Sequence, residues 1–191
     1  MPFGWHGKKI RLVPLEREKH FDNCVRWLND PEVTAWTLIG DFPLTRLAEQ
    51  EFFDRVARPS DTEVVFAIEL LGNPEEHVGV CGIHNISYRH GAGTIGLIIG
   101  RPQLWRRGLG TDVIAVLTRY AFEAASLRLL LSEAMSDNIG SIKAQTKCGY
   151  CEIGRIPGRY WKRGAYRDSI LFALTREDWR ARSSAAPQGT A

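Results

Sequence analysis

The segment Leu104–Asp112 constrains the fold of this chain most strongly, because it places cations and small residues directly before an apolar helix. The first turn of a helix leaves about four backbone N–H groups without acceptors and carries roughly half a positive charge. Arg106 and Arg107 add cations there, and Gly108 and Gly110 leave room for a ligand to approach the backbone. The segment therefore predicts a site for an anion such as a pyrophosphate. Apolar residues at helical spacing extend the predicted helix to about Ser126: Val113, Ile114, Val116, Leu117, Tyr120, Ala121 and Phe122.

A second helix is predicted one strand later. Residues 127–131 indicate a short buried strand, and Asn138–Tyr150 then indicates a helix that ends at Gly149. Together, the Arg-Arg-Gly-Leu-Gly-Thr turn and the Asn-x-x-Ser start of this helix resemble the GNAT (GCN5-related N-acetyltransferase) superfamily. Tyr166-Arg167-Asp168, before an apolar strand, is similar to the branch that acetylates ribosomal-protein N-termini and polyamines. The resemblance is specific from about residue 95 to residue 174.

The resemblance implies a fold of the α/β (α+β) class. It implies a mixed, mostly antiparallel central sheet of six to seven strands, with two splayed parallel strands at its centre and about four flanking helices. It also implies acetyl-CoA as cosubstrate, with the pyrophosphate at the first motif and the thioester beside the Asn138 helix. The backbone at residues 97–99 would pair with the pantetheine amides and polarise the thioester carbonyl. The predicted cofactor-binding residues are Leu97, Ile98, Ile99, Arg106, Arg107, Gly108, Leu109, Gly110, Thr111, Asn138 and Ser141.

One residue departs from the family's pattern. The first position of the phosphate motif is often Gln or Arg in the family, but it is Trp105 here. Because peptide N–H groups supply most of the phosphate contacts, the change should not abolish cofactor binding.

The predicted chemistry needs a base, because an alkyl ammonium has a pKa of about 10. Glu133 is the predicted base: it lies five residues before Asn138, the offset at which related N-terminal acetyltransferases carry Glu or His. Two alternatives are that Glu133 is an exposed carboxylate at a strand end and that His84 is the base. The predicted mechanism is direct attack of the amine on the thioester in a ternary complex, with no acyl-enzyme.

The departing thiolate also needs a proton. Many relatives use a Tyr seven residues beyond the Asn, a position that Gln145 occupies here. Ser141 lies three residues after Asn138, on the same helix face, and is the predicted acid. A role for Ser141 in capping or orienting the helix is the alternative.

Composition agrees with a single enzyme domain. The chain has 191 residues, 44% of them hydrophobic, which suffices for one sizeable core. Its net charge of +3 is milder than that of a dedicated nucleic-acid binder. The sequence has no run of about 18 apolar residues, and residues 1–9 lack an apolar signal segment. We therefore expect no membrane partner and a cytoplasmic location.

Three patterns that would suggest other chemistry do not fit their context. Cys148 and Cys151 form a Cys-x-x-Cys, but they follow the end of a helix, whereas a redox pair gains its reactivity at a helix start. Residues 91–96 match the dinucleotide-binding glycine pattern but precede a strand, so a hairpin turn is predicted. The five histidines show no zinc spacing, and no metal site is expected.

The remaining elements follow from periodicity and turn residues. We expect one domain over residues 1–181 and a flexible tail over 182–191, which is small and polar. The predicted helices cover residues 16–28, 32–36 and 45–57, and a short helical cap covers 175–179. The predicted strands cover residues 9–14, 64–71, 77–86, 94–99, 127–134, 151–159 and 165–174, with a turn at 72–74.

The acceptor is the least determined part of the prediction. In this family it is bound between a loop after the first helices, here Trp36–Phe42, and the last hairpin, here Arg159–Gly164. The hairpin is basic and the two loops offer few acids, which favours a peptide N-terminus, or an amino-sugar or amino-acid-like amine that carries negative charge, over a polyamine; a solvated turn is the alternative. A homodimer is a further expectation. A different class of function remains open: a CoA-binding regulatory or RNA-contacting module that uses the cations Arg155, Arg159, Lys162, Arg163 and Arg167.

Overall fold

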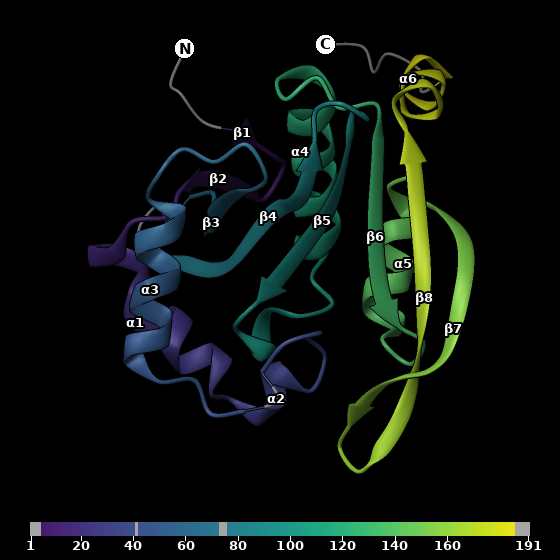
Figure 1. The fold of residues 1–191 in the computed structure, drawn as a ribbon. Coiled ribbons are helices and arrows are strands. Elements are labelled where there is room, and N and C mark those ends of the chain that lie inside the picture. Colours follow the sequence, from purple (N-terminus) through teal and green to yellow (C-terminus); the bar gives the residue numbers. More distant parts are fainter. Residues whose placement is uncertain (1–4, 41, 73–75, 186–191) are drawn as a thin grey trace.

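One eight-stranded sheet with helices on both faces forms the computed structural model, which describes residues 5–40, 42–72 and 76–185 (Figure 1). The strand order is β1-β2-β3-β4-β5-β6-β8-β7. The strands are β1 (Trp5–His6), β2 (Ile10–Pro14), β3 (Val64–Leu70), β4 (His77–Ser87), β5 (Ala92–Ile99), β6 (Leu129–Met135), β7 (Cys151–Lys162) and β8 (Ala165–Thr175). Every neighbouring pair is antiparallel except β5 and β6, which confirms the predicted mixed sheet.

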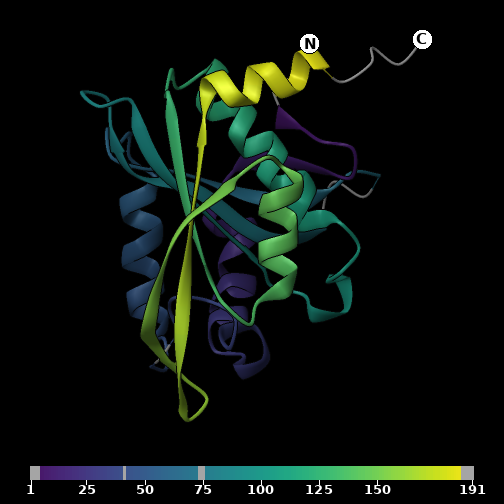
Figure 2. The same cartoon turned by 90° about the vertical axis from the view of Figure 1, so that its right-hand side faces the viewer.

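The helices are α1 (Arg17–Leu28), α2 (Pro31–Thr34), α3 (Arg46–Val56), α4 (Leu109–Glu123), α5 (Ile139–Lys147) and α6 (Arg176–Ala185). A 3-10 turn, η1 (Pro102–Leu104), precedes α4. In Figure 2, α3 lies on one side of the sheet and α4 and α5 lie on the other. Phe21 of α1 packs against Phe53 of α3, so the sheet separates a face with α1 and α3 from a face with α4 and α5.

The structure extends the predicted elements in three places. The eighth strand, β1, has only two residues and pairs with β2, so it is too short to leave a periodic signal. The described residues form six helices rather than about four, because α2 and α6 fold where short helical segments were predicted at residues 32–36 and 175–179. α6 continues to Ala185, so residues 182–185 of the predicted tail are helical, while residues 186–191 lie outside the described residues. Of the predicted turn at 72–74, residues 73 and 74 also lie outside them.

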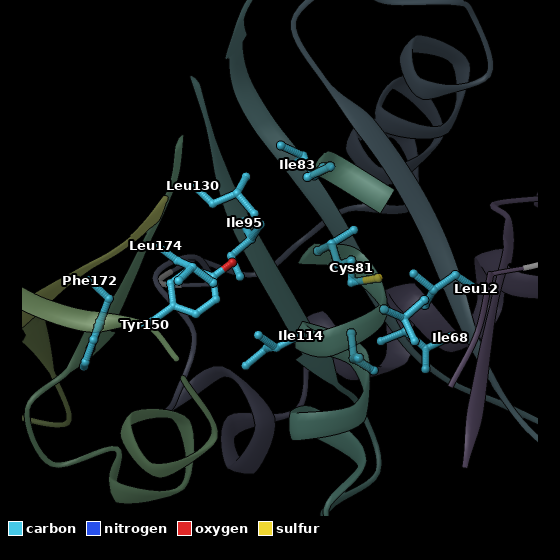
Figure 3. Close-up of a cluster of buried hydrophobic side chains, with 14 of the residues drawn as sticks. Leu12, Ile68, Cys81, Ile83, Ile95, Ile114, Leu130, Tyr150, Phe172 and Leu174 are labelled. Atoms are coloured by element: carbon cyan, nitrogen blue, oxygen red, sulfur yellow. The ribbon is translucent and has the colours of Figure 1, made fainter. Parts of the chain in front are cut away.

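The core lies between the sheet and α4 (Figure 3). Val113, Leu117 and Ala121 recur at every fourth residue of α4 and are fully buried, which explains why this segment forms one amphipathic helix. Ile95 and Leu130 join them from β5 and β6. Burying each Val, Leu or Ile side chain of this set stabilises the fold by about 1.5–3 kcal/mol, so α4 is fixed firmly against the sheet.

Two local predictions about turns are confirmed. Gly149 has a φ of +97° directly after the α5 C-cap residue Cys148, and the Tyr150 N–H donates to the Gln145 carbonyl. Gly91, with a φ of +62°, lies in the turn between β4 and β5, so the glycine-rich pattern there forms a hairpin.

All four cysteines are free thiols, and burial raises the pKa of Cys148 to about 11.

Gly100, at the end of β5, lies directly against the buried Trp27 side chain. A Cβ atom at this position would lie 1.9 Å from Cδ2 of Trp27. We expect Gly100→Ala to lower the free energy of unfolding by about 1–3 kcal/mol, because the indole and the strand must move apart. Urea unfolding measures the change. Gly154→Ala is the matched control, since its Cβ would make an ordinary 3.9 Å contact with Leu171; equal losses in both variants would contradict the close packing.

Two buried histidines, His20 and His77, lie with ring centroids 4.5 Å apart. The Glu16 N–H donates to Nδ1 of His20, and Nε2 of His77 lies 2.8 Å from the Gly79 carbonyl oxygen. A neutral ring satisfies both arrangements. Burial lowers the pKa of His77 from 6.5 to about 4 and also lowers the pKa of His20.

This cluster predicts acid sensitivity. As the pH falls from 6.5 towards 4, the unfolded chain binds a proton at His77 before the folded chain does. The folded state should therefore lose up to about 3 kcal/mol through His77 over this window, and none above it. Urea midpoints between pH 4.5 and 7.5 should show a shallower pH dependence in His77→Gln than in the wild type or in a His90→Gln control at an exposed turn. Parallel slopes would show that His77 does not titrate in this way.

Candidate active site

The site begins where the two central strands separate. β5 and β6 pair only through Ala92–Leu129, Gly93–Leu130 and Thr94–Leu131. Beyond these pairs, β5 continues against β4 alone and β6 continues against β8 alone, and Figure 1 shows the two strands diverging. The predicted splay of the parallel strands is therefore confirmed.

The splay exposes particular backbone groups of β5. The Gly100 N–H donates to the Val78 carbonyl on β4 at 2.9 Å. Because alternate residues of an antiparallel ladder face the same partner strand, Ile98 also bonds towards β4, while Leu97 and Ile99 face the splay. The Ile99 carbonyl accepts from the Trp105 indole at 2.8 Å. Of the three residues predicted to bind pantetheine through their backbone, Leu97 and Ile99 thus have the required orientation and Ile98 does not.

The first turn of α4 adjoins this strand. Gly108 is its N-cap residue, with a φ of +81°, and Leu109, Gly110 and Thr111 are its first three helical residues. Their N–H groups precede the first intrahelical bond, in which Asp112 donates to the Gly108 carbonyl. A Cβ on Gly110 would meet nothing closer than Leu97 Cδ1, at 4.0 Å. Three amides without intrahelical acceptors and an open glycine position therefore lie at the turn where the sequence predicts an anion site, and the exposed Arg106 and Arg107 precede it.

The start of β2 is tied to this turn. The Asp112 carboxylate accepts backbone N–H groups from Lys8, Lys9 and Ile10, at 2.7–3.2 Å. The Lys9 ammonium donates to the Arg107 carbonyl at 2.6 Å, which brings a third cation to the turn that precedes α4. The sequence analysis did not identify Lys9, because Lys9 and Arg107 are 98 positions apart in the sequence and no short motif contains both.

Asn138 and Ser141 open α5 as predicted. Oδ1 of the Asn138 side chain accepts the Ser141 N–H at 3.1 Å, so Asn138 is the helix cap. Nε2 of the buried Gln145 donates to Ser141 Oγ at 3.2 Å. Because this bond occupies a lone pair of the hydroxyl, the Ser141 proton can still be donated. The alternative in which Ser141 caps the helix is not what the structure shows.

Glu133 lies within β6, opposite Leu171 of β8, with its side chain only 14% exposed. The Ser169 hydroxyl donates to Oε1 of Glu133, and Arg159 Nε lies 3.4 Å from the same oxygen. Burial and a hydrogen bond to Glu133 raise the pKa of Tyr160 to about 12. Glu133 is therefore not an exposed carboxylate at a strand end: three side chains hold it in the wall of the site. None of the three was predicted as its partner, since they come from the later hairpin.

His84, the second candidate base, has a different setting. It lies opposite Thr94, at the end of β5 that is still paired with β6, and its Nδ1 is 3.4 Å from the Glu63 carboxylate. Burial and the nearby Arg55 lower its pKa. His84 thus contacts Glu63 at the end of the sheet where β5 and β6 are still paired, whereas Glu133 lies on the part of β6 that has separated from β5.

The two predicted acceptor segments meet at the open end of the splay. Lys162 Nζ donates to the Ile39 carbonyl at 3.0 Å, and Arg163 donates to the Pro31 carbonyl at 3.2 Å. Between them lies a pocket of about 70 Å³, which Trp36 lines from the α2 side and Met135 and Asp137 line from the end of β6. The Asn138 side chain also reaches the Trp36 carbonyl, at 3.5 Å. Residue 41, part of the predicted loop, lies outside the described residues.

The five hairpin cations do not form an open basic surface. Arg155 pairs with Asp168, Arg159 with Glu133, and Arg167 with Asp137, each through nitrogen–oxygen distances of 2.7–3.4 Å. Lys162 and Arg163 bind backbone carbonyls, as described above. These contacts within the chain do not favour the RNA-contacting alternative.

The described residues include neither a membrane-spanning helix nor a metal-binding cluster. None of the helices in residues 5–40, 42–72 and 76–185 has the length and apolar character needed to cross a membrane. Within the same residues, no group of three or more His, Cys, Asp and Glu side chains could hold a metal ion.

Comparisons of the sequence with known proteins identify its relatives. A family model described as "Acetyltransferase (GNAT) domain" matches residues 9–150. An uncharacterised N-acetyltransferase, p20, from Bacillus licheniformis is 24% identical over 179 residues, covering 91% of this chain and 97% of that protein. The FsC-acetyl coenzyme A-N(2)-transacetylase of Aspergillus fumigatus is 23% identical over 183 residues, covering 91% of this chain and 77% of that protein.

Solved structures share the fold at low sequence identity. Spermidine N-acetyltransferase from Vibrio cholerae, solved with CoA and spermine, superposes with a TM-score of 0.81 at 17% identity, covering 90% of this chain and 98% of that one. RimJ from Mycobacterium smegmatis, solved with CoA-disulfide, superposes with a TM-score of 0.76 at 19% identity, covering 88% of this chain and 83% of that one.

Proposed function

Because the chain belongs to the GNAT family of acetyltransferases, we propose that it transfers the acetyl group of acetyl-CoA to a primary amine by direct attack in a ternary complex. The observation that carries this proposal is the meeting of four features at one opening in the sheet. These are the splay between β5 and β6, the first turn of α4, the start of α5 and the Glu133 carboxylate.

The residues present fit the cosubstrate. The amides of Leu109, Gly110 and Thr111 would bind the pyrophosphate, with Arg106, Arg107 and Lys9 supplying positive charge. The outward-facing backbone of Leu97 and the N–H of Ile99 would bind the pantetheine and polarise the thioester carbonyl. When bound, acetyl-CoA supplies an acetyl group already activated as a thioester.

The proposed mechanism assigns one proton transfer to each of two side chains. Glu133 takes a proton from the acceptor ammonium, directly or through water, and so frees the nitrogen lone pair to attack the thioester carbon. Attack leaves the nitrogen with one excess proton; as the carbon–sulfur bond breaks, Ser141 Oγ gives its hydroxyl proton to the departing sulfur and takes this nitrogen proton through water, so Ser141 ends as a neutral hydroxyl. Gln145, which donates to Ser141 Oγ, holds that hydroxyl in place.

Thiol release from acetyl-CoA tests the function directly. The assay uses peptides with varied N-termini, spermidine, amino sugars and free amino acids as acceptors. Acetyl-CoA-dependent release that requires one class of amine supports the transferase. Absence of release with every class, despite a thermal shift with acetyl-CoA, would overturn amine acetylation and favour a non-catalytic CoA-binding module. A cytoplasmic location and a homodimer remain predictions.

Ser141→Ala should lower kcat by about 10- to 100-fold and leave the KM for acetyl-CoA nearly unchanged. The effect is moderate, because a thiol has a pKa of about 8.5 and its anion already leaves readily. Steady-state kinetics at pH 7 measure the change, with Ser183→Ala on the exposed part of α6 as the control. A Ser141→Ala enzyme with wild-type kcat would remove Ser141 from the mechanism.

A further inference from the structure

We infer that the amine acceptor carries a carboxylate close to its amino group, and that Arg163 and Arg167 bind this carboxylate in the pocket beside Trp36. The inference rests on the proposed function and specifies the class of its substrate. It differs from what the solved neighbours alone would suggest, because the Vibrio cholerae protein is named for spermidine, a polycation.

The position of the pocket is the first support. Met135, which lines it, is two residues beyond Glu133 on β6, so both side chains project from the same face of the sheet. On the opposite wall, the Trp36 carbonyl oxygen accepts a hydrogen bond from the Asn138 side-chain amide. Asn138 is the N-cap of α5, the helix that carries Ser141. A group seated in this pocket is therefore adjacent to the proposed base and to the expected position of the thioester.

The charge of the pocket is the second support. Its lining includes three cations, Lys162, Arg163 and Arg167, and one carboxylate, Asp137. Asp137 pairs with Arg167 at 3.0 Å, and Glu133, deeper in the site, pairs with Arg159. Positive charge therefore exceeds negative charge around the acceptor position. An anionic group reduces this excess, whereas each further ammonium of a polyamine increases it.

The donors and the size of the pocket indicate which anion fits. An arginine has five N–H groups in a planar fork that matches a carboxylate, and the bond from Arg163 to the Pro31 carbonyl uses one of them. The pocket volume of about 70 Å³ suits a carboxylate rather than a long chain. Trp36 gives it an apolar wall, and Ile39 and Phe42 of the same loop are 54% and 85% exposed. An α-amino acid with an apolar side chain combines these properties.

The decisive experiment compares, by thiol release, pairs of acceptors that differ only in the carboxylate. L-Phenylalanine is paired with L-phenylalaninamide, a peptide that begins with aspartate is paired with one that begins with asparagine, and spermidine is tested as a polycation. We expect kcat/KM for the acid to exceed that for its amide at least ~10-fold in at least one pair, the equivalent of one charged hydrogen bond. Equal or faster acetylation of the amide in both pairs, or faster acetylation of spermidine than of both acids, would overturn the inference and leave the transferase function intact.

The variant Arg163→Met tests whether the preference for a carboxylate acceptor arises in this pocket. It should lower kcat/KM for the carboxylate acceptor by about 10- to 100-fold and leave the amide unaffected. Arg155→Met, which removes a hairpin arginine paired with Asp168 outside the pocket, should change neither. If Arg163→Met has the same effect on both acceptors, Arg163 is a structural tie and the inference is wrong.

A binding measurement separates this inference from the transferase function. Calorimetry with the protein and CoA compares N-acetyl-L-phenylalanine with its amide, and N-acetylaspartate with its diamide. Stronger binding of either acid than of its amide supports the carboxylate site even when no amine is acetylated. Equal binding within both pairs, or no binding of any of the four, overturns it.

Discussion

Replacing Glu133 with glutamine is expected to lower kcat by about 100- to 10,000-fold, the range that a positioned general base contributes. The glutamine keeps the size of the side chain, and its carbonyl oxygen can still accept from Ser169, but it cannot take a proton at neutral pH. Steady-state kinetics of Glu133→Gln with the best acceptor of the panel measure the loss.

The pH dependence of the residual activity distinguishes a lost base from a damaged site. Without the base, the enzyme must use the free amine in solution, whose concentration rises about tenfold per pH unit until the pH reaches the pKa of the acceptor ammonium, about 8 for a peptide N-terminus and about 10 for an alkyl amine. The activity of Glu133→Gln should therefore rise with this slope, while the wild-type rate levels off earlier. Glu152→Gln, at an exposed carboxylate on β7, is the control and should behave as wild type. If Glu133→Gln retains full activity, His84→Gln becomes the test of the base.

Gly110→Asp is expected to raise the KM for acetyl-CoA at least ~100-fold without destabilising the protein. A Cβ at Gly110 has room, since its nearest neighbour would be 4.0 Å away, and a carboxylate in the first turn of a helix is favourable for the helix. The same carboxylate occupies the anion cradle of α4 and repels the pyrophosphate. Stability and cofactor binding should therefore change independently.

A thermal melt and a titration with acetyl-CoA measure the two effects separately. Gly110→Ala serves as the control, because it adds the Cβ without the charge and should raise the KM by much less. A Gly110→Asp protein that binds acetyl-CoA normally would show that the phosphates lie elsewhere. One that unfolds at a lower temperature would show that the added side chain is not tolerated as the geometry indicates.

The sequence predicted those parts of the site that a short stretch of chain forms by itself. The turn at Gly108, the α4 helix and the cap at Asn138 depend on residues within one helical turn of each other, so their motifs were readable. The seven longer strands were also predicted, because each has enough residues to show the hydropathy pattern of a strand.

Contacts between distant segments were not predictable in this way. Lys9 reaches the turn before α4, and Ser169, Tyr160 and Arg159 surround Glu133, only because the fold brings these distant segments together. The orientation of Ile98 follows from its register with β4, which no single-strand pattern specifies. One-residue shifts of register exchange the two sides of a strand, so such details need the paired structure.

The short pairing between β5 and β6 has a mechanical consequence. Three residue pairs join a five-stranded half of the sheet, β1 to β5, to a three-stranded half, β6, β8 and β7. A pantetheine bound along β5 would occupy the gap as a missing strand, and its phosphates would be held by α4 at the same time. Bound acetyl-CoA would then connect the two halves of the sheet. The protein would be most rigid with the cosubstrate bound and would become more flexible when CoA dissociates.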